Sequence, residues 1–142
     1  MIVGKLLPSV SKQVIQKNIN TYAEASGDYN PLHWDEQFAA DATHYGRIVA
    51  HGMLILAYIS EMMTQEFGMS WMEAGTLKVR FKAPVYPGDR VETFGEVVKL
   101  EEKEDGYNVS CSVGCRKIDG EDVIIGHASV YMPNISLGVE FA

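Results

Sequence analysis

The sequence predicts an α+β domain in which a curved antiparallel sheet wraps around a long apolar helix. The first half of the chain places apolar residues at helical spacing, whereas the chain from about residue 75 to residue 132 is strand-like and broken by turn signals. Between these parts lies the segment 53–67, whose first two turns are apolar all round, as is typical of a helix buried on every side. An apolar helix followed by several antiparallel strands favours a layered α+β structure.

The first half predicts one strand and two helices ahead of the apolar helix. We expect a strand near residues 5–14, which would complete the sheet. A helix should follow and end at Gly27, because glycine readily adopts the left-handed conformation that stops a helix. Its apolar face consists of Ile15, Ile19, Tyr22 and Ala23. A second, shorter helix is indicated by Phe38, Ala39 and Ala42, with Asp35 near its start as the N-cap or a first-turn acid.

Three turn signals divide the second half into strands: Pro87-Gly88-Asp89, Asp105-Gly106 and Asp119-Gly120. Between the last two turns, Val109, Cys111, Val113 and Cys115 alternate with Ser110, Ser112 and Gly114, as in a half-buried strand. On such a strand the Cα atoms of the two cysteines would lie about 13 Å apart, too far for a disulfide. Both are expected to be small core residues or free thiols.

Length and composition limit the classes of function. The 142 residues are expected to form one domain spanning 1–142, and 46% hydrophobic with 22% charged residues is a globular composition. A net charge of −7 without a basic stripe disfavours a nucleic-acid partner. The chain has no apolar run of membrane-spanning length, and its first residues have no signal-peptide pattern, so no membrane association and a cytoplasmic location are expected.

The stretch SGDYNPLH, residues 26–33, is the first candidate for chemistry. Asn30 precedes Pro31 and is pushed away from helical angles, so residues 28–32 should form a turn across which Asp28 and His33 can face one another. A carboxylate beside an imidazole is suited to proton transfer at neutral pH. The structural alternative is that Asp28 only closes the turn while His33 binds a backbone carbonyl.

The second candidate is RIVAHGML, residues 47–54, which places His51 and Gly52 directly before the apolar helix. The first N–H groups of a helix lack intrahelical partners and carry the positive end of the dipole, so they could hold an oxyanion. Gly52 would let a ligand approach the backbone closely. The alternative is that Gly52 only permits a tight entry into the helix and His51 caps it.

Together, SGDYNPLHWDEQFA and RIVAHGML resemble the signature of the MaoC-like dehydratases, and the later VRFKAPVYPGDRV is similar to the strand and turn that follow in that family. The family includes the (R)-specific enoyl-CoA hydratases and the beta subunit of mycobacterial (3R)-hydroxyacyl-ACP dehydratase. The resemblance runs from about residue 13 to 132. It implies a hotdog fold, in which an antiparallel sheet wraps a long helix, and a dimer with its acyl tunnel near the subunit interface.

The resemblance also implies an activity and the residues that carry it. The reaction is the reversible syn hydration of trans-2-enoyl thioesters of CoA or acyl carrier protein to (R)-3-hydroxyacyl thioesters, without a metal or redox cofactor. Asp28 and His33 match the pair that activates water, and Gly52 matches the position whose backbone N–H polarises the thioester carbonyl. The implied positions for orienting groups and binding substrate are Asn30, His51 and Ser60.

Several alternatives remain open at this point. The chain could be one subunit of a heteromeric dehydratase rather than a homodimer or higher homo-oligomer, or a module that only binds acyl thioesters. A hotdog thioesterase is less favoured, because its motifs do not normally include a GDxNPxH element. No HExxH or CxxC pattern indicates a metal site. Lys78, Arg80 and Lys82 fit either a solvated strand face or a contact with the phosphates of CoA.

Overall fold

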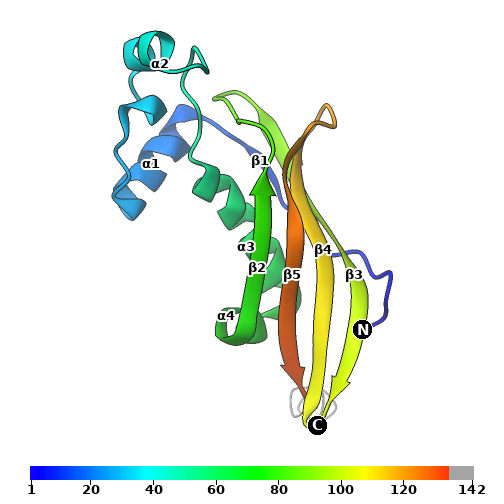
Figure 1. Ribbon diagram of the computed structural model, residues 1–142. Coiled ribbons are helices and arrows are strands. Elements are labelled where there is room, and N and C mark those ends of the chain that lie inside the picture. Colours follow the sequence, from blue (N-terminus) through cyan, green and yellow to red (C-terminus); the bar gives the residue numbers. More distant parts are fainter. Residues whose placement is uncertain (135–142) are drawn as a thin grey trace.

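One layer of the molecule is a five-stranded antiparallel sheet with the strand order β1-β3-β4-β5-β2, as the computed structural model of residues 1–134 shows (Figure 1). Its strands are β1 (Ser11–Gln13), β2 (Gly75–Phe81), β3 (Arg90–Lys103), β4 (Gly106–Lys117) and β5 (Asp122–Pro133). The three predicted turn signals all mark boundaries between strands, with Gly106 as the first residue of β4. The prediction of an α+β fold is confirmed.

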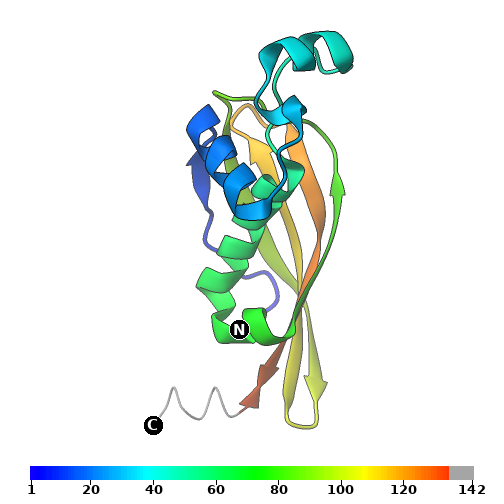
Figure 2. The same cartoon turned by 90° about the vertical axis from the view of Figure 1, so that its left-hand side faces the viewer.

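The helices lie on one side of this sheet, apart from α2, which lies beyond its end (Figure 2). They are α1 (Gln16–Ser26), the 3₁₀ helix η1 (Pro31–His33), α2 (Glu36–Ala42), α3 (Gly52–Phe67) and α4 (Met69–Ala74). As predicted, α1 ends at Gly27 in the left-handed region, with φ 78°, and the Asp35 side chain caps α2 by accepting a hydrogen bond from the Phe38 N–H. The sequence did not predict η1 or α4. None of the helices within residues 1–134 is long and apolar enough to cross a membrane.

Helix α3 packs against the central strands β3, β4 and β5 and forms the core with them. Its side chains Ile55, Ile59 and Met62 are almost completely buried there. Cys111 and Cys115 on β4 are buried and not disulfide-bonded, as predicted. Burial raises the pKa of the Cys111 thiol to about 11 and that of the Cys115 thiol to about 12, so both stay protonated at neutral pH.

Two predictions about these elements are wrong in part. The first two turns of α3 are not buried on every side, because Met53 is 55% exposed and Ala57, one turn later, is also exposed. The first strand covers only Ser11–Gln13 rather than residues 5–14. The residues before it still bond to β3, for example from the Leu7 N–H to the Gly95 carbonyl, but Pro8 has no N–H and interrupts the ladder.

Candidate active site

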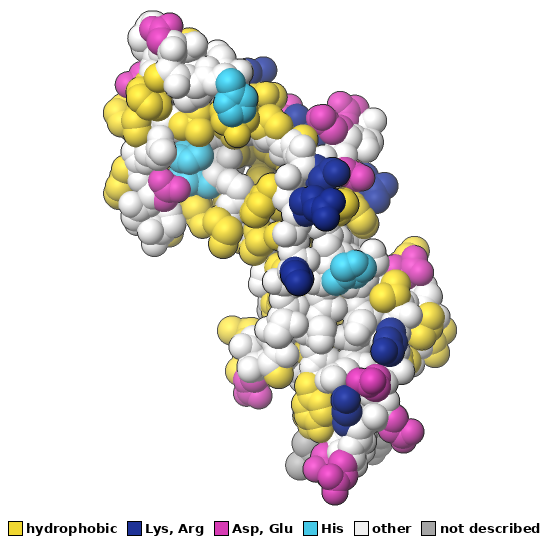
Figure 3. Space-filling model, viewed as in Figure 1, with side chains coloured by type: hydrophobic (Ala, Val, Ile, Leu, Met, Phe, Trp, Pro, Cys, Tyr) yellow, Lys and Arg dark blue, Asp and Glu magenta, His cyan; other side chains and the backbone are white. Residues whose placement is uncertain are grey.

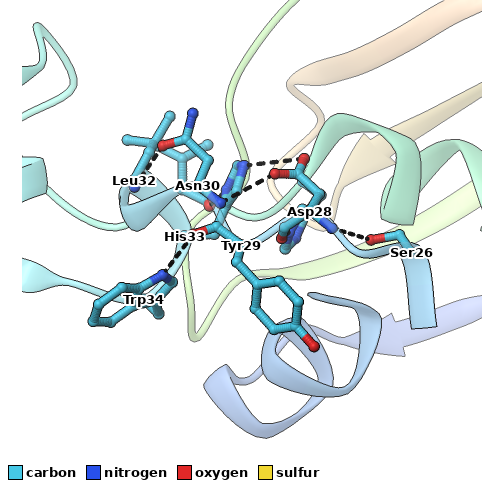
Figure 4. A network of polar contacts seen from close by, with 9 residues as sticks. Ser26, Asp28, Tyr29, Asn30, Leu32, His33 and Trp34 are labelled. Atoms are coloured by element: carbon cyan, nitrogen blue, oxygen red, sulfur yellow. Dashed lines mark hydrogen bonds and ion pairs between the residues drawn. The ribbon is translucent and has the colours of Figure 1, made fainter. Parts of the chain in front are cut away.

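The loop from α1 to η1 is held by three successive bonds between side chains and backbone (Figure 4). The Ser26 hydroxyl accepts from the Asp28 N–H at 3.2 Å, and Asp28 Oδ1 accepts from the Asn30 N–H at 3.2 Å. Asn30 Oδ1 then accepts from the Leu32 N–H at 3.0 Å and caps η1, which begins at Pro31. The role of Asn30 that the structure shows is therefore in building the turn.

The turn brings Asp28 and His33 face to face, with 3.9 Å between Asp28 Oδ2 and His33 Nε2 (Figure 4). The other oxygen of the carboxylate already holds the Asn30 N–H. His33 Nδ1 lies 2.6 Å from the Val49 carbonyl oxygen, which only accepts, so Nδ1 carries a proton, and in the neutral ring Nε2 presents its lone pair toward Asp28. Asp28 thus closes the turn and His33 binds a backbone carbonyl, as in the structural alternative. The two side chains nevertheless also face one another.

The gap between the two side chains is too long for a direct hydrogen bond but suits one water molecule. Two hydrogen bonds of about 2.8 Å from a single oxygen span the 3.9 Å separation when they meet at about 90°, close to the angle between the O–H bonds of water. Such a water would donate one proton to His33 Nε2 and the other to Asp28 Oδ2. Its lone pairs would then be free to attack an electrophile.

His51 lies directly behind this pair. It occupies the N-cap position of α3, but its side chain makes no capping bond, so the capping alternative is wrong. Instead, its Nε2–H donates to the backbone carbonyl of Asp28 at 3.0 Å, and its ring stacks on His33 with centroids 3.7 Å apart. The residue is 2% exposed, which lowers the pKa of His51; the neighbouring His33 lowers it further, while the bond to the Asp28 carbonyl opposes both effects.

A cavity of about 480 Å³ opens beside His33 and the start of α3. Figure 3 shows this hollow with histidine and hydrophobic side chains around it. Gly52 forms part of its wall, and a Cβ at this position would lie 3.0 Å from the ring of Phe81, so the glycine keeps the helix terminus open. The apolar wall includes Val49, Ile55, Val85 and Val123. An apolar chain can therefore lie beside backbone N–H groups that have no partner within the helix.

The predicted site residues do not all reach this cavity. His33 and Gly52 line it, whereas Asp28 and His51 reach it only through their contacts with His33. Ser60 lies eight residues after Gly52 along α3, and its Oγ accepts a hydrogen bond of 2.9 Å from Trp71 Nε1. In this chain Ser60 ties α4 to α3, and it does not line the cavity.

Other residues line the cavity without having been predicted. These are His44 and Tyr45, in the loop between α2 and α3, which form part of its wall with their rings 4.1 Å apart. Lys82, one of the three cations that the sequence left open as phosphate contacts, also lines the cavity, directly after β2. No local pattern in the sequence marks His44 or Tyr45. They reach the site through the tertiary placement of their loop, whose Ala50 N–H donates to the Val85 carbonyl.

Asp28, His33 and His51 each place one ligand atom within 4.8 Å of the others, the spacing of a possible metal cluster. The geometry does not favour metal binding. His33 Nδ1 and His51 Nε2 already bind carbonyl groups, and the rings are stacked with an interplanar angle of 24°. Lone pairs in the planes of two stacked rings do not converge on one ion. This cluster fits acid/base chemistry better than metal coordination.

Comparison with known proteins is consistent with this geometry. The family model of the MaoC-like domain matches residues 2–117 of the sequence. A mitochondrial 3-hydroxyacyl-[acyl-carrier-protein] dehydratase of Arabidopsis thaliana is 34% identical over 122 residues, covering 85% of this chain and 72% of the relative. An (R)-specific enoyl-CoA hydratase of Aeromonas caviae is 32% identical over 120 residues, covering 81% of this chain and 88% of the relative.

Solved structures share the fold. The (R)-hydratase from A. caviae involved in PHA biosynthesis superposes with a TM-score of 0.79 at 30% identity, covering 94% of this chain and 98% of that one. The (3R)-hydroxyacyl-ACP dehydratase complex HadBC of Mycobacterium tuberculosis superposes with a TM-score of 0.73, covering 93% of this chain and 98% of that one. Its 19% identity is informative for the fold alone.

Proposed function

The chain belongs to the MaoC-like domain family, and on this premise we propose that it is a hydro-lyase that hydrates trans-2-enoyl thioesters reversibly to (R)-3-hydroxyacyl thioesters. The observation that carries the proposal is the separation of 3.9 Å between Asp28 Oδ2 and His33 Nε2, which suits one bridging water molecule. This pair lies beside a cavity that has one apolar wall and also contains the N-terminus of a helix. A thioester with an acyl chain is complementary to each of these parts.

In the proposed reaction, Asp28 and His33 hold one water molecule. Its oxygen bonds to Cβ of the enoyl group, the C=C electrons move to form an enolate, and His33 Nε2 accepts a proton from the water. The enolate then takes a proton at Cα from the same pair and returns to a thioester. Because one pair serves both carbons, the hydrogen and the hydroxyl add to the same face. Dehydration follows the same steps in reverse.

The enolate needs a donor at the thioester oxygen, and we propose the backbone N–H of Gly52 for this role. Gly52 begins α3, where the N–H groups carry the positive end of the helix dipole. One donor of this kind is worth about 3–4 kcal/mol of transition-state stabilisation, comparable to the acid/base contribution. The reaction as proposed requires no redox cofactor.

The carrier of the acyl group is proposed to be CoA or acyl carrier protein, which present the same phosphopantetheine arm. Lys82 lines the cavity, and Lys78 and Arg80 precede it on β2. No ion pair to any of these three is found among residues 1–134. Although the chain is acidic overall, Lys and Arg side chains lie beside the hollow (Figure 3). In this position they would contact the phosphate groups of the carrier.

We propose a homodimer in which β2 and the exposed face of α3 contact a second copy. Strand β2 lies at the edge of the sheet and bonds only to β5 within the described chain. Met53 and Ala57 leave an apolar strip exposed on α3, as expected for a surface that is covered by a partner. A cytoplasmic location and the choice between a homodimer and a higher homo-oligomer stay predictions.

The first test is loss of enoyl absorbance when the purified protein is mixed with crotonyl-CoA. Asp28→Asn should lower kcat by at least about 100-fold with the fold intact, because an acid/base group is lost. Asp119→Asn is the matched control: this aspartate also accepts the N–H two residues later, but in the turn between β4 and β5. Equal activity of the Asp28→Asn variant and the wild type would remove Asp28 from the mechanism.

Inactivity of the wild type would favour a different proposal. If enoyl absorbance stays constant with crotonyl-CoA, with longer-chain substrates and with carrier-protein substrates, the chain is either a subunit that needs a different partner or a module that only binds acyl thioesters. Release of free thiol without hydration would indicate a thioesterase.

A further inference from the structure

We propose that His51 is a positioning residue that holds Asp28 and His33 at the separation required for a shared water. This inference rests on the proposed function of the pair. It assigns His51 a place behind the reacting groups rather than in contact with the substrate. Two independent contacts carry it, one to each member of the pair.

The first contact fixes the backbone of Asp28. The Asp28 carbonyl accepts a hydrogen bond of 3.0 Å from His51 Nε2, across 23 positions of sequence. Asp28 lies in an exposed loop, and its side chain is 51% exposed; its bonds to Ser26 and Asn30 stay within the loop itself. The bond to His51 joins this loop to the N-terminus of α3, the buried helix that also carries Gly52. This bond thereby fixes the position of the Asp28 carboxylate relative to the proposed oxyanion donor.

The second contact fixes the ring of His33. The two imidazoles stack with centroids 3.7 Å apart and an interplanar angle of 24°. The bond from His33 Nδ1 to Val49 sets which nitrogen faces Asp28, but a single bond leaves the ring free to tilt about it. His51 supports one face of that ring, and His51 is itself packed against the ring of Tyr22 in an edge-type contact, with 4.8 Å between centroids.

Simple packing does not account for an imidazole at this position. The ring is 2% exposed, and its Nδ1 is buried with no hydrogen-bond partner within residues 1–134. An unpaired buried nitrogen is destabilising, and an apolar ring of the same size would avoid that cost. What an apolar ring lacks is the Nε2–H that binds the Asp28 carbonyl. The structure therefore retains a group that costs stability and holds the catalytic loop.

Two amide substitutions separate the hydrogen bond from the ring. In His51→Gln the side-chain amide reaches the position of Nε2 and can still donate to the Asp28 carbonyl. In His51→Asn it reaches only the position of Nδ1 and cannot. We expect His51→Asn to lower kcat by about tenfold or more with little change in KM, and His51→Gln to stay within about threefold of the wild type. Both variants lose the ring and its stack on His33, so the difference between them isolates the bond to the Asp28 carbonyl. Equal losses would overturn the proposal that this bond positions Asp28.

A double-mutant cycle with Asp28→Asn tests whether His51 acts through Asp28. If it does, Asp28→Asn should cost far less in the His51→Asn background than the roughly 100-fold expected in the wild type, because the carboxylate is already misplaced. Fully additive losses would show that His51 supports only the general structure. If His51→Asn does not fold, His51→Phe keeps the ring volume, lacks the donor and takes its place in the cycle.

Crystal structures of the variants distinguish failure of this inference from failure of the proposed function. The distance from Asp28 Oδ2 to His33 Nε2 should remain near 3.9 Å in His51→Gln and should lengthen in His51→Asn. An unchanged distance in His51→Asn overturns the positioning role even if the enzyme is active. A lengthened distance supports that role even if Asp28→Asn proves to have no effect on hydration, in which case the proposed function alone fails.

Discussion

At the scale of single residues, backbone carbonyls decide the chemistry of the two stacked histidines. His33 donates from Nδ1 to Val49, and His51 donates from Nε2 to Asp28, so the two rings hold their protons on opposite nitrogens. In the neutral ring the lone pair of His33 faces a carboxylate, whereas that of His51 lies in the interior and has no hydrogen-bond partner among residues 1–134. Identical side chains thus take different roles, and only His33 is placed to exchange protons with a substrate.

The burial of His51 predicts a specific pH dependence of stability. Burial lowers its folded pKa below 6.5, so as pH falls the unfolded chain binds the proton first. The contribution to the free energy of unfolding is therefore fully present above pH 6.5 and is lost as pH falls from 6.5 through the folded pKa. Urea unfolding between pH 8 and pH 5 should show a smaller decrease for His51→Phe than for the wild type. Parallel curves would contradict this assignment.

At the scale of elements, β2 performs two tasks through the alternation of its side chains. Leu77 and Val79 pack against the core, while Lys78 and Arg80 are exposed on the alternate positions. The strand ends next to Lys82, at the rim of the cavity. Because side chains alternate along a strand, the cations of β2 all lie on its exposed face and lead toward the site, and none of them lies in the core.

This arrangement predicts that β2 affects substrate binding rather than chemistry. The variant with both Arg80→Gln and Lys82→Gln should raise KM for crotonyl-CoA about threefold or more at low salt, with kcat nearly unchanged, because exposed cations attract the phosphates of the carrier. Lys103→Gln, at the hairpin between β3 and β4 and paired with Glu101, is the control. An unchanged KM at low salt would indicate that these residues only form a solvated strand face and do not contact the substrate.

At the scale of the whole molecule, two surfaces of the single chain are of the kind that a partner usually covers. The outer edge of β2 has no strand partner among residues 1–134, and the start of α3 exposes apolar side chains next to the candidate site. Exposed strand edges and apolar surfaces of this kind favour association. A second copy placed here would cover the helix face that the sequence predicted to be buried.

The proposed homodimer is tested by light scattering after size exclusion. Ala57→Glu places a charge in the exposed strip of α3 and should shift the protein from dimer to monomer, because burying an unpaired carboxylate at an interface is strongly unfavourable. Leu6→Glu introduces the same group at an exposed apolar position beside β3, away from β2, and should leave the dimer intact. A wild-type monomer, or a dimer that tolerates Ala57→Glu, would contradict this interface.

The sequence by itself determined the features that depend on neighbours along the chain. Helical spacing and Gly27 set the extent of α1, the Asp35 side chain set the start of α2, and turn residues divided the strands. The five-residue spacing of Asp28 and His33 around Asn30-Pro31 also indicated that these two side chains lie near one another, because the turn between them is built from local bonds. Periodicity, capping and turn chemistry act over a few residues, so they can be read from the sequence.

Only the tertiary structure decided the features that join distant segments. The bond between His51 and the Asp28 carbonyl spans 23 positions, Ser60 is bound by Trp71 rather than facing the cavity, and His44 reaches the cavity through the path of its loop. The exposure of Met53 was likewise set by which face of α3 the sheet covers. No local pattern encodes these contacts, because each depends on how the packing of α3 against the sheet orients the segments around it.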